Sequence, residues 1–152
     1  MATATRVTSG AAQYATFFLN GMYFGVPVLQ VQEVIRSPQV TRVPLAAPDV
    51  VGLVNLRGEI APVIDLRRRL SLPVEKGPKD PLQVVVRSSE GAVGLMVDEI
   101  GDVIDVDLGS REPPPRTLPR GMVGLVTGVY KFDKALLLAL DIESVVRVDG
   151  RT

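Results

Sequence analysis

The sequence contains no cysteine and no histidine among its 152 residues. These two absences exclude disulfides, thiol nucleophiles, Cys/His metal sites and every mechanism that uses imidazole as its base. The two glycine-rich motifs that bind nucleotide phosphates, GxxxxGK[ST] and GxGxxG, are also missing. We therefore expect a protein with no enzymatic activity and no cofactor.

An excess of charge of either sign is missing as well. Seventeen Lys and Arg balance seventeen Asp and Glu, so the formal net charge is zero. Such a chain has no long-range attraction to nucleic acid or to an anionic membrane. The first ten residues lack the compact apolar run of a secretion signal, and the uncharged stretch between Arg6 and Glu33 has too many polar and helix-breaking residues for a membrane span. The expected location is the cytoplasm.

The charged residues that do cluster are not expected to form a site. Asp98 and Glu99 are neighbours along a strand and point to opposite faces, whereas Asp105 and Asp107 are predicted to be solvated. Their spacing lacks the glycine turn and the distal glutamate of a calcium loop. The basic run 67–69 is predicted to be a solvated helix face beside Asp65, in preference to a patch that binds phosphate or carboxylate.

The chain is organised around the stretch from Val51 to Leu70. Two apolar runs, 51–56 and 60–66, flank a polar break at 57–59, which is typical of a β-hairpin. The second run alternates, which predicts a single core face, and Pro62 predicts either an edge strand or a break in pairing. The tip of this hairpin carries Arg57 in an otherwise apolar neighbourhood.

Further strands are predicted on both sides of this hairpin. Asn20-Gly21 predicts a type I′ turn between strands at 13–19 and 22–28, because both central residues of that turn need positive φ. The remaining pattern is a turn near 29–32 before a strand to residue 36, a proline-containing loop at 37–49, strands at 82–87, 92–97 and 103–106, and a last hairpin at 122–140 turning at 131–133. Helical turns are expected after Leu66 and Asp141.

The predicted organisation is a flexible N-terminal tail, 1–11, followed by a single domain, 12–148. The polar, proline-rich segment 75–81 is expected to divide this domain into a first lobe of about 13–74 and a second of about 82–146. An exchange of strands between the two lobes is left open.

The second half of the chain echoes the first. Residues 24–28 align with 93–97 and, without a gap, 31–35 align with 100–104; further on, 52–54 align with 124–126 and 62–66 with 138–142. Five short strands in each half cannot bury both faces as a flat sheet, so the pattern predicts two small closed barrels with a groove between them. A single sandwich, in which the echo arises because Val, Gly and Leu are common, is the alternative.

Four segments, in the same order, resemble the CheW family of coupling proteins of bacterial chemotaxis. They are VQEVI at Val31–Ile35, VTRVP at Val40–Pro44, GLVNLRGEIAPVIDL at Gly52–Leu66 and VGLMVDEI at Val93–Ile100. The resemblance extends from residue 13 to about 146. It implies a mainly β fold of two SH3-like five-stranded β-barrel subdomains packed together, with short helical turns and no catalytic activity.

The resemblance also implies partners and sites. The protein would be a cytoplasmic adaptor that couples the cytoplasmic tips of chemoreceptors to the regulatory domain of the histidine kinase CheA in a membrane-associated array, in rings with other CheW-like domains. By position, Val31, Glu33, Val34 and Arg57 would bind the receptor, and Asn55, Arg57 and Gly58 would couple receptor and kinase. A small β-barrel that binds nucleic acid, or another protein-interaction module, is the alternative function.

Overall fold

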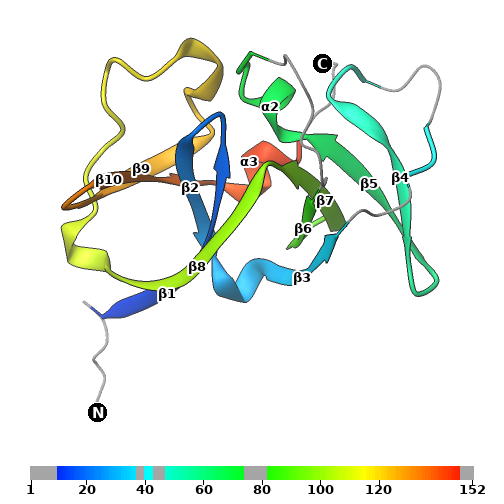
Figure 1. Cartoon of the computed structure of the whole chain (residues 1–152), viewed down its shortest axis with the longest axis horizontal. Coiled ribbons are helices and arrows are strands. Elements are labelled where there is room, and N and C mark those ends of the chain that lie inside the picture. Colours follow the sequence, from blue (N-terminus) through cyan, green and yellow to red (C-terminus); the bar gives the residue numbers. More distant parts are fainter. Residues whose placement is uncertain (1–9, 37–39, 43–46, 74–81, 148–152) are drawn as a thin grey trace.

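The computed structural model describes residues 10–36, 40–42, 47–73 and 82–147, and it is mainly β (Figure 1). Ten strands and a few short helices follow one another along these residues: β1 (Ala11–Leu19), β2 (Met22–Pro27), η1 (Val28–Gln30), β3 (Val31–Arg36), β4 (Val50–Leu56), β5 (Glu59–Asp65), α2 (Leu66–Arg69), β6 (Leu82–Ser88), β7 (Gly91–Val97), β8 (Glu99–Asp107), η2 (Leu108–Ser110), η3 (Arg120–Met122), β9 (Val126–Phe132), β10 (Ala135–Leu140) and α3 (Ile142–Val145). The predicted tail, except for residues 10 and 11, and the predicted lobe boundary at 75–81 lie outside the described residues.

The strands form two five-stranded sheets, which we call barrel A and barrel B. Barrel A has the strand order β8-β1-β2-β10-β9, and barrel B has the order β3-β6-β7-β5-β4. The two orders become identical when each strand of the first five is exchanged for its counterpart in the second five, β1 for β6 through β5 for β10. The repeat seen in the sequence is thus a repeat of topology.

Neither half of the chain makes a barrel by itself. The first half contributes β1 and β2 to barrel A and β3, β4 and β5 to barrel B, and the second half contributes the complementary strands. Parallel pairing joins β10 to β2 and β5 to β7. The division into contiguous lobes at 75–81 therefore does not describe the sheets, and the exchange of strands that the sequence left open is what the structure contains.

Hydrophobic side chains form three clusters, and the largest lies between the barrels. It includes Phe17 and Phe24 from barrel A and Ile64 and Leu95 from barrel B. A smaller cluster lies inside barrel B and another inside barrel A. The interface between the barrels is therefore a shared core, and the predicted groove between them stays a prediction.

This arrangement also corrects the prediction that β5 has a single core face. Val63 belongs to the cluster inside barrel B, while the next residue, Ile64, and Leu66, which begins α2, belong to the cluster between the barrels, and all three are buried. Successive side chains of a strand point to opposite faces, so a strand with a core on each side is apolar on both. The strand is also internal, since it lies between β7 and β4, but its pairing with β7 begins only after Pro62.

The predicted turns have mixed outcomes. Asn20 and Gly21 have φ of 51° and 77°, and Leu19 pairs with Met22, which confirms the type I′ turn. The last hairpin turns at 133–134 and not at 131–133, because Phe132 is still paired with Ala135. Residues 122–125 precede β9 and are not part of it, and β8 is longer than predicted.

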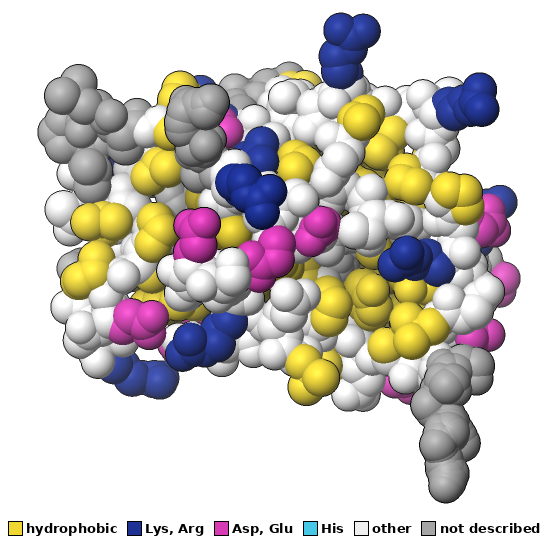
Figure 2. Space-filling model, turned by 180° about the vertical axis from the view of Figure 1, so that it is seen from behind, with side chains coloured by type: hydrophobic (Ala, Val, Ile, Leu, Met, Phe, Trp, Pro, Cys, Tyr) yellow, Lys and Arg dark blue, Asp and Glu magenta, His cyan; other side chains and the backbone are white. Residues whose placement is uncertain are grey.

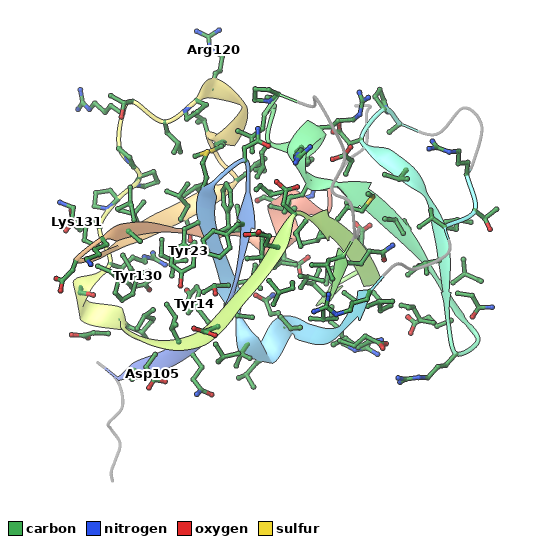
Figure 3. The ribbon with its side chains drawn as sticks, in the orientation of Figure 1. Tyr14, Tyr23, Asp105, Arg120, Tyr130 and Lys131 are labelled. Atoms are coloured by element: carbon green, nitrogen blue, oxygen red, sulfur yellow. The ribbon has the colours of Figure 1, made fainter. Side chains whose placement is uncertain are left out.

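Barrel A encloses a pair of tyrosines, Tyr14 from β1 and Tyr130 from β9, with ring centroids 5.6 Å apart in an edge-on arrangement (Figure 3). Burial, followed by the effect of the adjacent Tyr130, raises the pKa of Tyr14 from 10.0 to about 12. Ionisation of this phenol is therefore less favourable in the folded protein than in the unfolded chain.

The raised pKa of Tyr14 predicts a loss of stability in alkali. Below pH 10 the stabilisation is present in full, because both states carry the protonated phenol; it is lost as the pH rises from about 10 to 12, where the unfolded chain releases the proton first. Between pH 9 and pH 11.5 the melting temperature of the wild type should fall by a few degrees more than that of Tyr14→Phe. Parallel slopes for the two proteins would contradict this assignment.

Candidate functional site

The tip of the β4–β5 hairpin holds its arginine in a strained conformation. Arg57 has a φ of 57° and Gly58 one of 95°, so both central residues of the turn are left-handed. The side-chain Oδ1 of Asn55 accepts a hydrogen bond of 2.8 Å from the Gly58 amide, which closes the turn. A left-handed conformation costs an L-residue other than Asn, Asp or Gly roughly 1–2 kcal/mol. Folding alone would favour Asn at position 57.

Arg57 reaches across the open side of barrel B to Glu33. Its Nη2 lies 3.4 Å from the Glu33 Oε1, and the two side chains are 85% and 23% exposed. A bulge in β3 between Val31 and Glu33 shifts the register there, and Gln32 donates to the other Glu33 oxygen at 3.4 Å. An ion pair with one fully solvated partner contributes little stability, about 0–1 kcal/mol. The structure thus brings two predicted site residues together without needing them for the fold.

Exposed apolar side chains lie in β3 and β5, beside these two residues, and in η1, which precedes β3. Val34 in β3 is 48% exposed, Ile60 in β5 is 57% exposed, and Leu29 in η1 is 94% exposed. Val31 differs from them, because it is partly buried against the core between the barrels. We call the set Glu33, Val34, Arg57 and Ile60 the hairpin-tip surface.

The sequence analysis missed Leu29 and Ile60. The signal available for Ile60 was its position directly after the turn, whereas Leu29 stands in a run of apolar residues that gave no indication of its exposure. Asn55 and Gly58, predicted to take part in coupling, have a shaping role here, since their mutual hydrogen bond sets the turn that presents Arg57.

The basic run 67–69 is solvated beside Asp65, as predicted, only at Arg68, whose side chain is 54% exposed. Arg67 is paired with Asp98 at 2.6 Å, and Arg68 lies 3.6 Å from Asp65. Arg69 donates at 2.8 Å to the carbonyl oxygens of Val145 and Ser144, at the end of α3. Each guanidinium therefore has a partner within the chain. On the face shown in Figure 2, basic and acidic side chains are interspersed.

The acidic residues have more than one environment. Asp98 lies between β7 and β8 and is not solvated, because Arg67 and the amide of Asn20 both bind its carboxylate. Asp105 and Asp107 are exposed, as predicted. Within the described ranges no group of three or more Asp or Glu is placed to hold a metal ion.

The fold and the hairpin-tip surface define a class of protein, a module of two intertwined SH3-like barrels that presents an exposed charge among apolar side chains. The pattern of the CheW-like domain matches residues 13–149. The chain is 32% identical over 130 residues to the chemotaxis protein CheW of Bacillus subtilis, a match that covers 86% of this chain and 83% of that protein. It is 30% identical over 137 residues to the chemotaxis protein CheW of Helicobacter pylori, covering 90% and 82%.

A solved structure agrees with these relatives. The crystal structure of the scaffolding protein TtCheW from Thermoanaerobacter tengcongensis superimposes with a TM-score of 0.82 at 30% identity, covering 92% of this chain and 95% of that chain. The chain therefore belongs to the CheW-like domain family. This membership confirms the resemblance found in the sequence and the predicted pair of SH3-like barrels.

Proposed function

We propose that this protein is a non-enzymatic adaptor that couples the cytoplasmic tips of chemoreceptors to the regulatory domain of the histidine kinase CheA. Family membership supports a scaffold role, since the relatives are named as chemotaxis proteins and the solved neighbour as a scaffolding protein. The single observation that carries the proposal within this chain is Arg57, an exposed arginine held in a conformation that costs folding energy.

The hairpin-tip surface has the composition of a docking site. A charged pair, Glu33 and Arg57, is flanked by exposed apolar groups, Val34 next to Glu33 in β3 and Ile60 in β5 just after the tip. Apolar anchors with a polar surround are typical of small interfaces. In this proposal the surface contacts the receptor, with Val31 contributing its exposed part, and Asn55 and Gly58 act by fixing the tip.

The proposed location is the cytoplasmic side of a membrane-associated receptor array, in rings with other CheW-like domains. No helix in the described part of the chain is long and apolar enough to cross a membrane, so in this proposal the contact with the membrane passes through the receptors. Interfaces near or below roughly 1,000 Å² are weak singly, and an array makes up for this by multivalency.

Charge reversal at the tip tests the proposal. Arg57→Glu should reduce the receptor-dependent activation of CheA, measured as ATP consumption in a reconstituted array, by about tenfold or more, because it places like charges on the tip and on Glu33. The melting temperature should change by no more than a few degrees, since the side chain is 85% exposed.

Arg57→Asn is the matched control for the turn. Asparagine accepts the left-handed conformation, so this variant should be as stable as the wild type or more so while still losing activation. Full activation by Arg57→Asn would show that the arginine is a turn residue without a partner. Retained activation by both variants, or binding that falls steeply with salt to any single-stranded nucleic acid, would overturn the adaptor proposal.

A further inference from the structure

Barrel A has a groove between its two edge strands, β8 and β9, which do not pair with each other. The groove has a volume of about 880 Å³. Its sides are β8 and the β9–β10 turn, and its floor includes Phe18 and Tyr23, whose rings stack with centroids 5.0 Å apart. Figure 3 labels two of the lining residues, Tyr23 in β2 and Lys131 in β9.

The internal repeat allows the groove of barrel A to be compared with the equivalent part of barrel B. By the alignments 31–35 with 100–104 and 62–66 with 138–142, Glu33 corresponds to Asp102 and Arg57 to Asp133. In barrel B these two positions hold opposite charges in contact, Glu33 and Arg57. In barrel A the equivalent positions hold two carboxylates, and both line the groove. Like charges repel, so no ion pair can bridge barrel A at the point where one bridges barrel B.

The bulge that positions Asp102 is a built feature of β8. The register of β8 against β1 shifts opposite Thr16, as the register of β3 shifts beside Glu33. The Thr16 hydroxyl donates to the Asp102 carbonyl oxygen at 2.5 Å, and a Cβ on Gly101 would overlap that hydroxyl. A bulge re-aims the side chains beside it.

One flank of the groove, β8, has free backbone and acidic side chains. Among the described strands, β8 pairs only with β1, so its other edge is unpaired along the groove. This strand carries four exposed acidic residues and no basic one: Glu99, Asp102, Asp105 and Asp107. The other flank carries Lys131, Asp133 and Lys134, and Lys131 is paired with Glu112 at 3.2 Å.

We propose that this groove binds an extended segment of a partner protein that places a basic side chain between Asp102 and Asp133, with apolar side chains on either side against Ile100 and Phe132. The segment would add to the free edge of β8 and supply in trans the charge that Arg57 supplies within barrel B. This proposal does not depend on the proposed receptor and kinase contacts. If it fails, the adaptor proposal is unaffected.

The test uses the full chain and a designed probe, an end-capped seven-residue peptide with valine, arginine and valine at its second, fourth and sixth positions and threonine elsewhere. Titration followed by amide NMR should shift the signals of 100–104 and 131–135. The same peptide with glutamate in place of arginine should bind at least about tenfold more weakly. Asp133→Arg, which rebuilds the barrel B pair with Asp102, should weaken binding of the arginine peptide about tenfold or more.

Two further variants keep the result interpretable. Asp102→Asn should weaken binding several-fold without adding a bulky group, and Asp105→Asn, on the same strand but outside the groove, should bind as the wild type does. Equal binding of the two peptides, shifts elsewhere on the chain, undiminished binding by Asp133→Arg, or no binding at millimolar peptide would overturn the proposal. Concentration-dependent dimerisation that Asp133→Arg abolishes would also overturn it, because the occupant would then be a second copy of this chain.

Discussion

The two halves of the chain, separated between Pro73 and Leu82, should each fail to fold alone and should fold together when mixed. Each half supplies strands to both barrels, and the parallel pairs β10–β2 and β5–β7 both cross the division. A lone half would leave these edges unpaired and the buried faces of Phe24 and Leu95 in water. Circular dichroism should show no cooperative melting for either fragment and a single transition for the equimolar mixture.

The outcome separates exchanged barrels from sequential ones. If each barrel were made from one half, each fragment would melt cooperatively by itself and mixing would add nothing. Cooperative melting of either fragment alone would therefore show the strand order to be wrong. A mixture that stays unfolded, with the covalent chain folded, would mean that the loss of chain connectivity outweighs the shared core.

Phe24→Ala should lower the free energy of unfolding by about 3–5 kcal/mol. Phe24 is fully buried, stacks on Phe17 with ring centroids 6.1 Å apart, and belongs to the cluster that joins the barrels. For a domain of this size the melting temperature should fall by about 10–20 °C. Because the damaged core is common to both barrels, the whole chain should still unfold in one transition.

The positions of the tyrosines make it possible to measure whether the whole chain unfolds in one transition. Tyr14, Tyr23 and Tyr130 all lie in barrel A, so tyrosine fluorescence follows that barrel while far-ultraviolet circular dichroism follows both. The two melting curves should coincide for the wild type and for Phe24→Ala. Separate midpoints would show that the barrels unfold independently. Leu29→Ala, at a side chain that is 94% exposed, is the control and should leave the melting temperature unchanged within about a degree.

Local patterns predicted the features that depend on adjacent residues. The Asn20-Gly21 turn was readable because positive φ at two successive positions admits few residue types. The β4–β5 hairpin was readable from two apolar runs around a polar break, and the family from four ordered segments. The prediction of a solvated face at 67–69 was confirmed at Arg68 and wrong for Arg67 and Arg69, because their partners, Asp98 and the end of α3, are distant in the sequence.

The candidate site was predictable in its residues but not in its geometry. Sequence alone singled out Glu33 and Arg57 separately; their contact depends on the bulge in β3 and on the closeness of the β4–β5 tip to that strand. The exposure of Leu29 and the open groove of barrel A likewise depend on which strands meet. None of these leaves a local pattern, because exposure is a property of the assembled surface.

By itself, the sequence determined the strand-rich fold, the repeat, the main turns and the exclusion of cysteine and histidine chemistry, since each follows from residue identity or from short-range periodicity. Only the tertiary structure decided that the repeats exchange strands, that the largest core is shared by the two barrels, and that one barrel is bridged by an ion pair while the equivalent positions of the other hold two carboxylates. The physical reason is that strand pairing and the encounter of charges depend on contacts between distant residues, and a period of two is the same whichever partner a strand takes.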